Sequence, residues 1–298
     1  MKDLVNSIDL KNVLVIGGSG FLGSHVADAL TDAGFKVCIF DKSPSTYLKE
    51  NQQMIVGDIL NSKDLDQAIL GCFAVYNFAA IADIDEALNK PIDTVKINIL
   101  GNIQILDSCK RNNVERYVYA STVYVNSREG GFYRCSKQAA EQYVEQYWHT
   151  YGLSYTILRY GSLYGPRSDQ HNGLWRIVKN ALETGKLSYI GSPEAMRQYI
   201  HVVDAAKASV NALDKEFRNE CVVLTGQEPM LVKDLLKMIA EILGISHNVE
   251  FIESKYEGHY IRTPYAYQPK IGRKYVPPLH VDLGQGLLEL ITELDNNK

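Results

Sequence analysis

The feature that most constrains the fold is a series of short apolar runs that do not alternate with polar residues and are separated by segments of helical periodicity. The runs fall at 12–16, 36–40, 54–56, 74–78, 116–120 and 155–159, and the helical segments at 21–30, 62–70, 93–111 and 133–151. A strand that is apolar on both faces needs a layer of helices on each side. The pattern therefore predicts an α/β fold with a doubly wound parallel sheet.

Beyond residue 165 the expected elements become shorter and more mixed. We expect helices at about 174–184, 204–213 and 232–243, strands near Leu187 and Cys221, and a stretch rich in Tyr and Pro at 256–278. We therefore predict a sheet domain over 1–165, to which a segment near 195–215 returns, and a smaller mixed α/β domain over 166–298. No internal repeat is visible, which argues against a solenoid.

Composition and charge exclude several classes of protein. The chain has 298 residues, 46% of them hydrophobic and 22% charged, with a formal net charge of −4. This is the make-up of a globular protein, and without a dense basic block it argues against nucleic acid or an anionic membrane as partner. No segment approaches the ~18 apolar residues of a membrane span, and residues 1–10 lack the apolar core of a signal peptide, so we expect a cytoplasmic protein. The five cysteines lie far apart, which predicts reduced thiols and no metal site.

A glycine-rich loop joins the first apolar run to the first helix. Gly17, Gly20 and Gly23 lie at positions one, four and seven of this loop. Missing side chains allow a tight turn and let a pyrophosphate approach the N–H groups at the start of the helix, around Phe21 and Leu22. A glycine-rich turn without a ligand is the alternative, because the motif alone is a weak signal.

Acidic residues follow the second and third apolar runs. Asp41 lies 18 residues beyond Gly23, where a carboxylate accepts hydrogen bonds from the adenosine ribose and repels a 2′-phosphate. This position favours NAD over NADP, although the adjacent Lys42 softens the preference. Asp58, followed by Ile59, is a candidate acceptor for the adenine amino group, and a helix-capping role for Asp58 is the alternative.

A tyrosine and a lysine lie four residues apart on a predicted helix. Tyr133 and Lys137 therefore share one helical face. The reference pKa of a phenol is about 10, but a nearby ammonium and a positively charged nicotinamide favour the phenolate, which is a competent general base. Ser121 and Thr122 follow the fifth apolar run and so emerge at the carboxyl edge of the sheet, where such folds bind ligands. An exposed helix pair and a strand-end cap are the alternatives for these residues.

Taken in order, these motifs resemble those of the extended short-chain dehydrogenase/reductase family, in its nucleotide-sugar epimerase branch. The resemblance runs from about Val13 to Asp204 and returns weakly near the C-terminus. Besides the loop and the catalytic candidates, it rests on 77–80, Asn98 within 96–101, 159–167 and 197–204.

The resemblance implies a Rossmann-type fold, a tightly held NAD and a nucleotide-diphosphate sugar as substrate, bound by the smaller domain. The resemblance implies that Tyr133 is the base, that Thr122 is its hydroxyl partner, and that Lys137 binds the nicotinamide ribose. The same comparison assigns NAD contacts to Phe78, Ala79, Ala80, Asn98 and Tyr160, and substrate contacts to Ser121, Ser162, Arg197 and Tyr199. It also implies a homodimer, formed by the helices at 93–111 and 133–151, and a setting such as the synthesis of surface-polysaccharide precursors.

Several positions depart from the family pattern. Tyr133 follows Thr122 by only 11 positions, Ser162 replaces an asparagine, and Gly161 replaces a common aromatic residue and is expected to widen the site. Ser121 is the fallback for the catalytic hydroxyl. Val123 and Tyr124 stand where related dehydratases carry an acid/base pair, so we predict epimerisation, with C4 as the favoured carbon. A 4,6-dehydratase, a keto-sugar reductase and a non-catalytic dinucleotide sensor are the alternatives.

Overall fold

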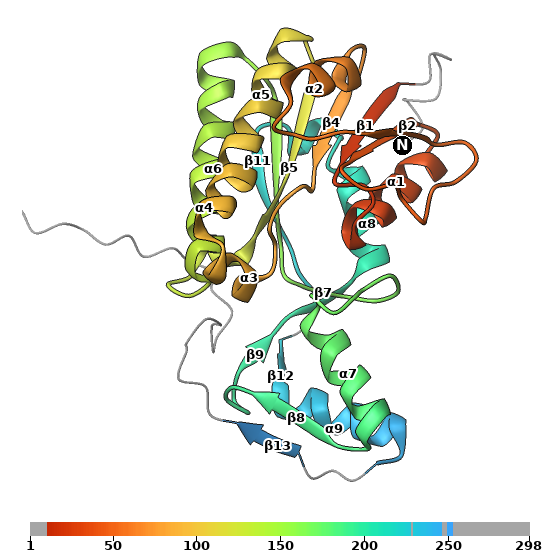
Figure 1. Ribbon diagram of the computed structural model, residues 1–298, viewed down its shortest axis with the longest axis vertical. Coiled ribbons are helices and arrows are strands. Elements are labelled where there is room, and N and C mark those ends of the chain that lie inside the picture. Colours follow the sequence, from red (N-terminus) through yellow and green to blue (C-terminus); the bar gives the residue numbers. More distant parts are fainter. Residues whose placement is uncertain (1–10, 228, 246–248, 253–298) are drawn as a thin grey trace, which may run out of the picture. The chain divides into compact units, whose positions relative to one another are not determined.

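The computed structural model of the protein describes residues 11–227, 229–245 and 249–252. A seven-stranded sheet has all neighbouring strands parallel, in the order β11-β6-β5-β4-β1-β2-β3 (Figure 1). Its strands are β1 (Asn12–Ile16), β2 (Lys36–Asp41), β3 (Gln53–Val56), β4 (Ala74–Asn77), β5 (Arg116–Thr122), β6 (Tyr155–Tyr160) and β11 (Glu220–Leu224). The predicted doubly wound, Rossmann-type sheet is confirmed.

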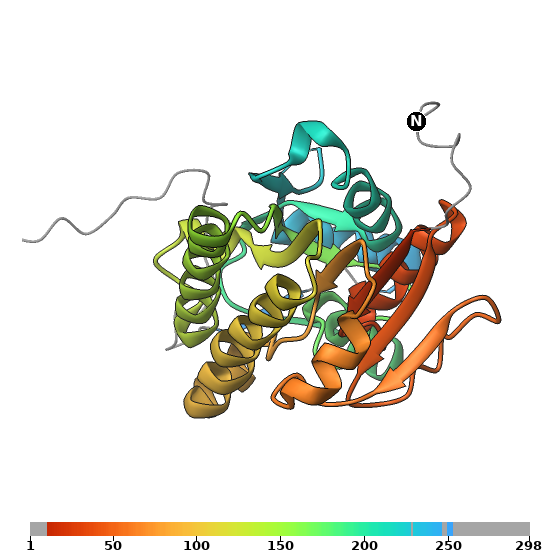
Figure 2. The same ribbon diagram turned by 90° about the horizontal axis from the view of Figure 1, so that it is seen from above.

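Helices cover both faces of this sheet because successive strand residues point to opposite sides. In β1, Val13 and Val15 join a buried cluster with α1 and α8, whereas Leu14 and Ile16 join a cluster with α2, α5 and α6. Figure 2 shows the same layers from above, with α5 and α6 side by side as in Figure 1. These helices are α1 (Phe21–Asp32), α2 (Ser62–Ile69), α5 (Asn102–Arg111), α6 (Gly131–Tyr151) and α8 (Val202–Asn211).

The connection from β4 to α5 differs from the single helix predicted for 93–111. The chain forms α3 (Ile84–Asn89), α4 (Pro91–Thr94) and then a wider π-helical segment, η1 (Val95–Gly101), before α5 begins. π-helical turns inside helices are rare and often occur at functional sites. Two short 3₁₀ segments, η2 (Val123–Asn126) and η3 (Lys215–Phe217), complete the connections around the sheet.

A third hydrophobic cluster is built from elements after residue 165. It joins α7 (Gly173–Thr184), β8 (Leu187–Ile190), α9 (Val232–Leu243) and β13 (Val249–Ile252), with β8 and β13 paired in parallel. Two further strand pairs are β7 (Ser162–Tyr164) with β10 (Tyr199–His201), and β9 (Met196–Arg197) with β12 (Met230–Leu231).

The predicted division into two domains stays a prediction, while α8 and β11 pack with the large sheet. The stretch 256–278 lies outside the described residues. No helix in the described part of the chain is both long and apolar enough to cross a membrane.

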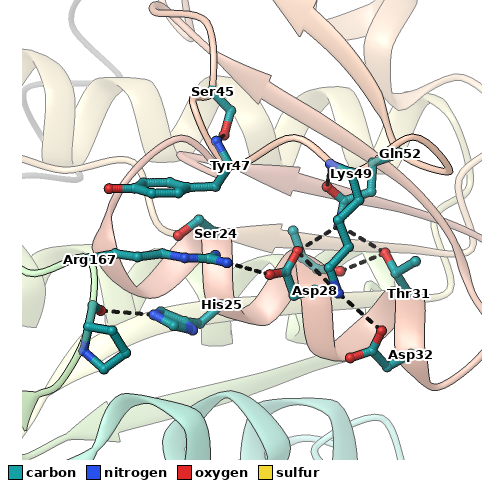
Figure 3. Close-up of polar contacts among 12 residues, drawn as sticks. Ser24, His25, Asp28, Thr31, Asp32, Ser45, Tyr47, Lys49, Gln52 and Arg167 are labelled. Carbon is teal, nitrogen blue, oxygen red and sulfur yellow. Dashed lines mark hydrogen bonds and ion pairs between the residues drawn. The ribbon is translucent and has the colours of Figure 1, made fainter.

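A group of polar side chains connects α1 to two loops, and we call it the α1 polar network (Figure 3). The carboxylate of Asp28 accepts from Arg167 Nη2 at 2.7 Å and from Gln52 Nε2 at 3.1 Å. The Arg167 guanidinium also lies 4.5 Å from the centroid of the Tyr47 ring, and His25 Nε2 lies 2.9 Å from the Pro166 carbonyl oxygen. The network therefore attaches the 45–52 loop and the 165–168 loop to the same helix.

Candidate active site

The glycine loop lies where the strand order reverses, between β1 and β4. Gly17 has φ +77°, and a Cβ there would lie 2.6 Å from Ala79 N and 2.7 Å from the Phe78 carbonyl carbon. A Cβ at Gly23 would lie 2.2 Å from Gly17 O, so these positions require glycine for close packing. The N-cap residue of α1 is Gly20, and no side chain caps the helix or places a carboxylate in its first turn. The N–H groups around Phe21 and Leu22 are thus suited to a pyrophosphate, as NAD requires.

Asp41, at the end of β2, lies beside the glycine loop. Its carboxylate accepts from Ser19 N at 3.1 Å and from Ser43 N at 3.2 Å, while Lys42 is exposed. Because Asp41 is fixed beside the glycine loop, its negative charge opposes a 2′-phosphate and fits NAD. Asp58 is exposed and accepts from Leu60 N at 2.9 Å.

Two neighbours of Asp58 complete this side of the crevice. Ile59 is buried against the sheet. The cap of α2 is Asn61, whose side chain accepts from Lys63 N, so Asp58 does not have the capping role that was its alternative.

Asn98 connects the segment after β4 to the catalytic helix. Its amide accepts from Ile81 N at 2.8 Å and donates to Ile81 O at 3.0 Å and to Ser136 Oγ at 2.9 Å. Ser136 in turn donates to the Tyr133 carbonyl oxygen at 2.8 Å. Asn98 lies within η1 and is 2% exposed. It therefore positions backbone beside Ala80 and Tyr133.

Thr122, Tyr133 and Lys137 come together at the carboxyl edge of β5. The Thr122 hydroxyl accepts from Tyr124 N at 3.3 Å, and it lies near enough to the Tyr133 phenol to lower the pKa of that phenol. Lys137 Nζ donates to the Ala120 carbonyl oxygen at 2.7 Å and lies 5.9 Å from the centroid of the Tyr133 ring. Ser121 turns elsewhere, because its hydroxyl donates to Glu141. Of the two adjacent hydroxyls, Thr122 is the one in contact with Tyr133.

Burial dominates the protonation of the two titratable residues. It raises the pKa of Tyr133 to about 12, against the smaller effect of the Thr122 hydrogen bond, and lowers the pKa of Lys137 to about 7, against the raising effect of Glu141. The protein alone therefore keeps Tyr133 as a neutral phenol at pH 7. The expectation that the lysine one turn away favours the phenolate does not hold without the charge of the cofactor.

Three of the four expected substrate residues lie in β7, β9 and β10, whereas Ser121 lies in β5. Ser162 is the register partner of Tyr199, and Arg197 is 7% exposed, with Nη1 donating to Met196 O at 3.0 Å. The Tyr160 hydroxyl is buried 2.6 Å from Ser209 Oγ, so Tyr160 can offer only backbone atoms to a ligand in the crevice.

Gly161 does not widen the site as expected. A Cβ there would lie 2.9 Å from Thr225 Cγ2 and 3.0 Å from Gln198 O, so neighbouring atoms occupy the space. A separate cavity of about 270 Å³ lies beside α7. It is lined by residues that include Tyr164, Trp175 and Leu182, and none of the expected site residues lines it. Among the described residues, no group of three or more His, Cys, Asp or Glu side chains could hold a metal ion.

Glu141 is the residue that the sequence analysis missed. It follows Lys137 by four positions on α6, is 4% exposed, and forms an ion pair with Arg159 through Nε at 3.0 Å and Nη2 at 2.7 Å. The spacing of Tyr133, Lys137 and Glu141 by four was the available signal, since it places all three on one helical face.

Known proteins resemble this chain along most of its length. A putative UDP-glucose 4-epimerase of Methanocaldococcus jannaschii is 27% identical over 96% of this chain and 99% of its own. The structure of UDP-glucose 4-epimerase from Thermotoga maritima with UDP-glucose has a TM-score of 0.79 at 26% identity, covering 86% of this chain and 90% of that one. A UDP-glucuronic acid 4-epimerase from Bacillus cereus, in complex with UDP-glucuronic acid and NAD, has a TM-score of 0.77 at 26% identity, covering 88% and 95%.

The family model agrees with these resemblances and with the geometry of the crevice. The model of the NAD dependent epimerase/dehydratase family matches residues 13–224, which include the glycine loop, Asp41 and the Tyr133–Lys137 pair. The cofactor is NAD. The chain belongs to the NAD dependent epimerase/dehydratase family of sugar-nucleotide enzymes.

Proposed function

We propose that the protein is a UDP-sugar 4-epimerase that acts through a transient 4-keto sugar, with Tyr133 as the general base. The observation that carries the proposal is the meeting of Thr122, Tyr133 and Lys137 at the carboxyl edge of the sheet, beside the crevice that fits NAD. The names of the similar proteins, which include epimerases of UDP-glucose and UDP-glucuronic acid, support uridine diphosphate as the nucleotide.

Tyr133, Thr122 and Lys137 have different roles in the proposed reaction. Tyr133 takes the proton of the C4 hydroxyl, and the Thr122 hydroxyl shares this hydrogen bond. NAD held beside the glycine loop and Lys137 would supply the hydride acceptor for C4 and, in the return step, the hydride donor. Tyr133 then gives its proton back to the C4 oxygen, so protons and electrons balance over the cycle. Lys137 holds the nicotinamide ribose and supplies positive charge near Tyr133.

Net inversion requires the keto sugar to present its other face before the hydride returns. Arg197 and Ser162 hold the diphosphate during this step, and the planar donor fork of arginine suits phosphate oxygens. The sugar can therefore turn while the nucleotide stays bound.

The residues after Thr122 favour epimerisation over elimination. Dehydration needs an acid and a base near C5, and here Val123 is a buried apolar residue and Tyr124 begins the short η2 turn with it. A 4,6-dehydratase or a keto-sugar reductase of the same family remains the alternative reading, and a non-catalytic dinucleotide sensor is the alternative from another class.

Proton NMR in deuterated water, with NAD and a panel of UDP-sugars, tests the reaction. A C4 epimer without deuterium at C5 is the expected product. Loss of water with deuterium uptake would make the enzyme a dehydratase, and no change in any sugar would favour the reductase or the sensor.

Tyr133→Phe and Thr122→Val should each lower kcat at least about 100-fold with NAD still bound. Ser121→Ala should cost less, because Thr122 supplies the hydroxyl in contact with Tyr133.

We also propose that two copies of the chain associate through α4, η1 and α6. Large apolar side chains are exposed on these elements, including Ile92 at 70%, Val95 at 54% and Phe132 at 47%. Large apolar side chains that are exposed to solvent are common at interfaces between proteins. The homodimer expected from the family resemblance would cover it.

A further inference from the structure

Glu141 lies behind the catalytic residues, outside the crevice that holds the cofactor. It is 4% exposed, and its carboxylate accepts hydrogen bonds from two neighbouring strands, β5 and β6. Ser121 from the end of β5 donates to Oε1, and Arg159 from β6 donates to both oxygens. Lys137 lies one turn earlier on the same face of α6.

We propose that Glu141 is a positioning residue of the active site, which fixes the end of β5 through Ser121 and keeps a negative charge one helical turn from Lys137. This inference rests on the proposed roles of Tyr133, Thr122 and Lys137.

Glu141 acts on the position of three consecutive residues at the end of β5. Ser121 immediately precedes Thr122, and Ala120, which precedes both, accepts from Lys137 Nζ at 2.7 Å. Fixing the Ser121 hydroxyl on Glu141 therefore fixes both the Thr122 hydroxyl and the acceptor of Lys137. Arg159 in turn holds the carboxylate in one orientation through two hydrogen bonds.

Glu141 also favours the protonated form of Lys137 through its negative charge. Burial lowers the pKa of Lys137 to about 7, and among the residues that the structure describes the charge that opposes this effect is Glu141. Lys137 otherwise faces the rings of Tyr119 and Tyr133, at 4.8 and 5.9 Å from their centroids. Glu141 itself faces Arg159, Tyr119, Tyr155 and Cys221 from the sheet, and Glu145 follows it on α6. Without Glu141, the protonated fraction of the Lys137 side chain at neutral pH would be smaller.

The test is the pH profile of kcat for the NAD-loaded Glu141→Gln enzyme. Glutamine keeps the volume and a hydrogen-bond acceptor for Ser121 but removes the charge. We expect the alkaline limb of the profile, which reports loss of the Lys137 proton, to move about one pH unit lower. Glu145→Gln removes the same charge one turn further from Lys137 and should leave the limb in place. An unchanged limb in Glu141→Gln, or an equal shift in both variants, would overturn the proposal.

Glu141→Asp separates charge from position. It keeps the carboxylate but shortens the side chain, so it should lower kcat about tenfold or more while the alkaline limb stays within a few tenths of a unit. If Glu141→Gln fails to fold because Arg159 loses its partner, the double variant Glu141→Gln/Arg159→Gln removes both charges and should show the same downward shift.

A matching Tyr133→Phe measurement distinguishes the two levels of the argument. If Tyr133→Phe keeps normal activity, the proposed function fails. If Tyr133→Phe is inactive and Glu141→Gln keeps the wild-type profile, the proposed function stands and only the role of Glu141 fails.

Discussion

At the scale of single residues, burial acts in opposite directions on the two titratable side chains that the proposed reaction uses. It raises the pKa of Tyr133 to about 12 and lowers that of Lys137 to about 7. Each shift favours the neutral form, as expected for groups removed from water. The pair of phenolate and ammonium is therefore unfavourable in the protein alone, and the positive charge of the oxidised cofactor would favour the phenolate of Tyr133.

The buried Lys137 should reduce the stability of the NAD-free protein in a defined pH range. In the unfolded chain its pKa is the ordinary 10.5, so between pH 7 and 10.5 the unfolded state binds more protons and stability rises with pH. Lys137→Met should therefore raise the free energy of unfolding by about 2 kcal/mol below pH 7, with a gain that shrinks towards pH 10.

Urea unfolding at pH 6, 8 and 10 without NAD measures this effect. Lys207→Met, which changes an exposed lysine of α8, is the control and should alter stability little at any of these pH values. A Lys137→Met protein that is less stable than wild type at pH 6 would contradict the argument.

At the scale of elements, Asp28 holds two loops against α1. Its side chain is 14% exposed and pairs with Arg167, which is 22% exposed and precedes α7 by a short loop. Asp28→Asn removes the charge but keeps the shape, and leaves Arg167 without its ionic partner. We expect the free energy of unfolding to fall by about 1–2 kcal/mol.

Asp32→Asn is the matched control for this prediction. Asp32 lies one turn further along α1, is 71% exposed and pairs with Lys49. The same substitution there should cost less than about 0.5 kcal/mol, since exposed ion pairs contribute little. Equal losses in the two variants, measured by urea unfolding, would show that the partly buried pair has no special role.

At the scale of the whole molecule, the proposed dimer would cover the exposed apolar side chains of η1 and α6. Val95→Glu places a charge at the centre of the proposed interface. We expect it to change the molar mass measured by light scattering from that of two chains to that of one. Ile242→Glu, at an exposed apolar position of α9, should leave the mass unchanged. A wild-type protein with the mass of one chain would contradict the proposed dimer.

Most of the large sheet was predictable because its signal is local. Apolar runs that are buried on both faces and glycines in a strand-to-helix turn are visible in the sequence, and the strands from β1 to β6 begin and end within two residues of their expected positions. The short strands β7, β9, β10 and β12 were not predicted. Each has only two or three residues, and their pairing comes from segments that are far apart in the sequence.

The site was predictable in part for the same reason. Gly17 belongs to a turn, Tyr133 and Lys137 belong to one helix, and Asp41 ends the strand that follows the first helix, so each lies in a motif of one strand-helix-strand unit or smaller. The π-helical turn around Asn98 was not visible, because it depends on contacts of Asn98 with Ile81 and Ser136.

Strand burial and helical periodicity are local properties of the chain, so the sheet, the glycine loop and the pairing of Tyr133 with Lys137 are visible in the order of the amino acids. Packing between distant segments sets other features: Ser121 turns to Glu141 while Thr122 lies near Tyr133, and the space beside Gly161 is filled. It also decided the direction in which each pKa moves. Burial and long-range contacts set these features, and they exist only when distant segments pack together.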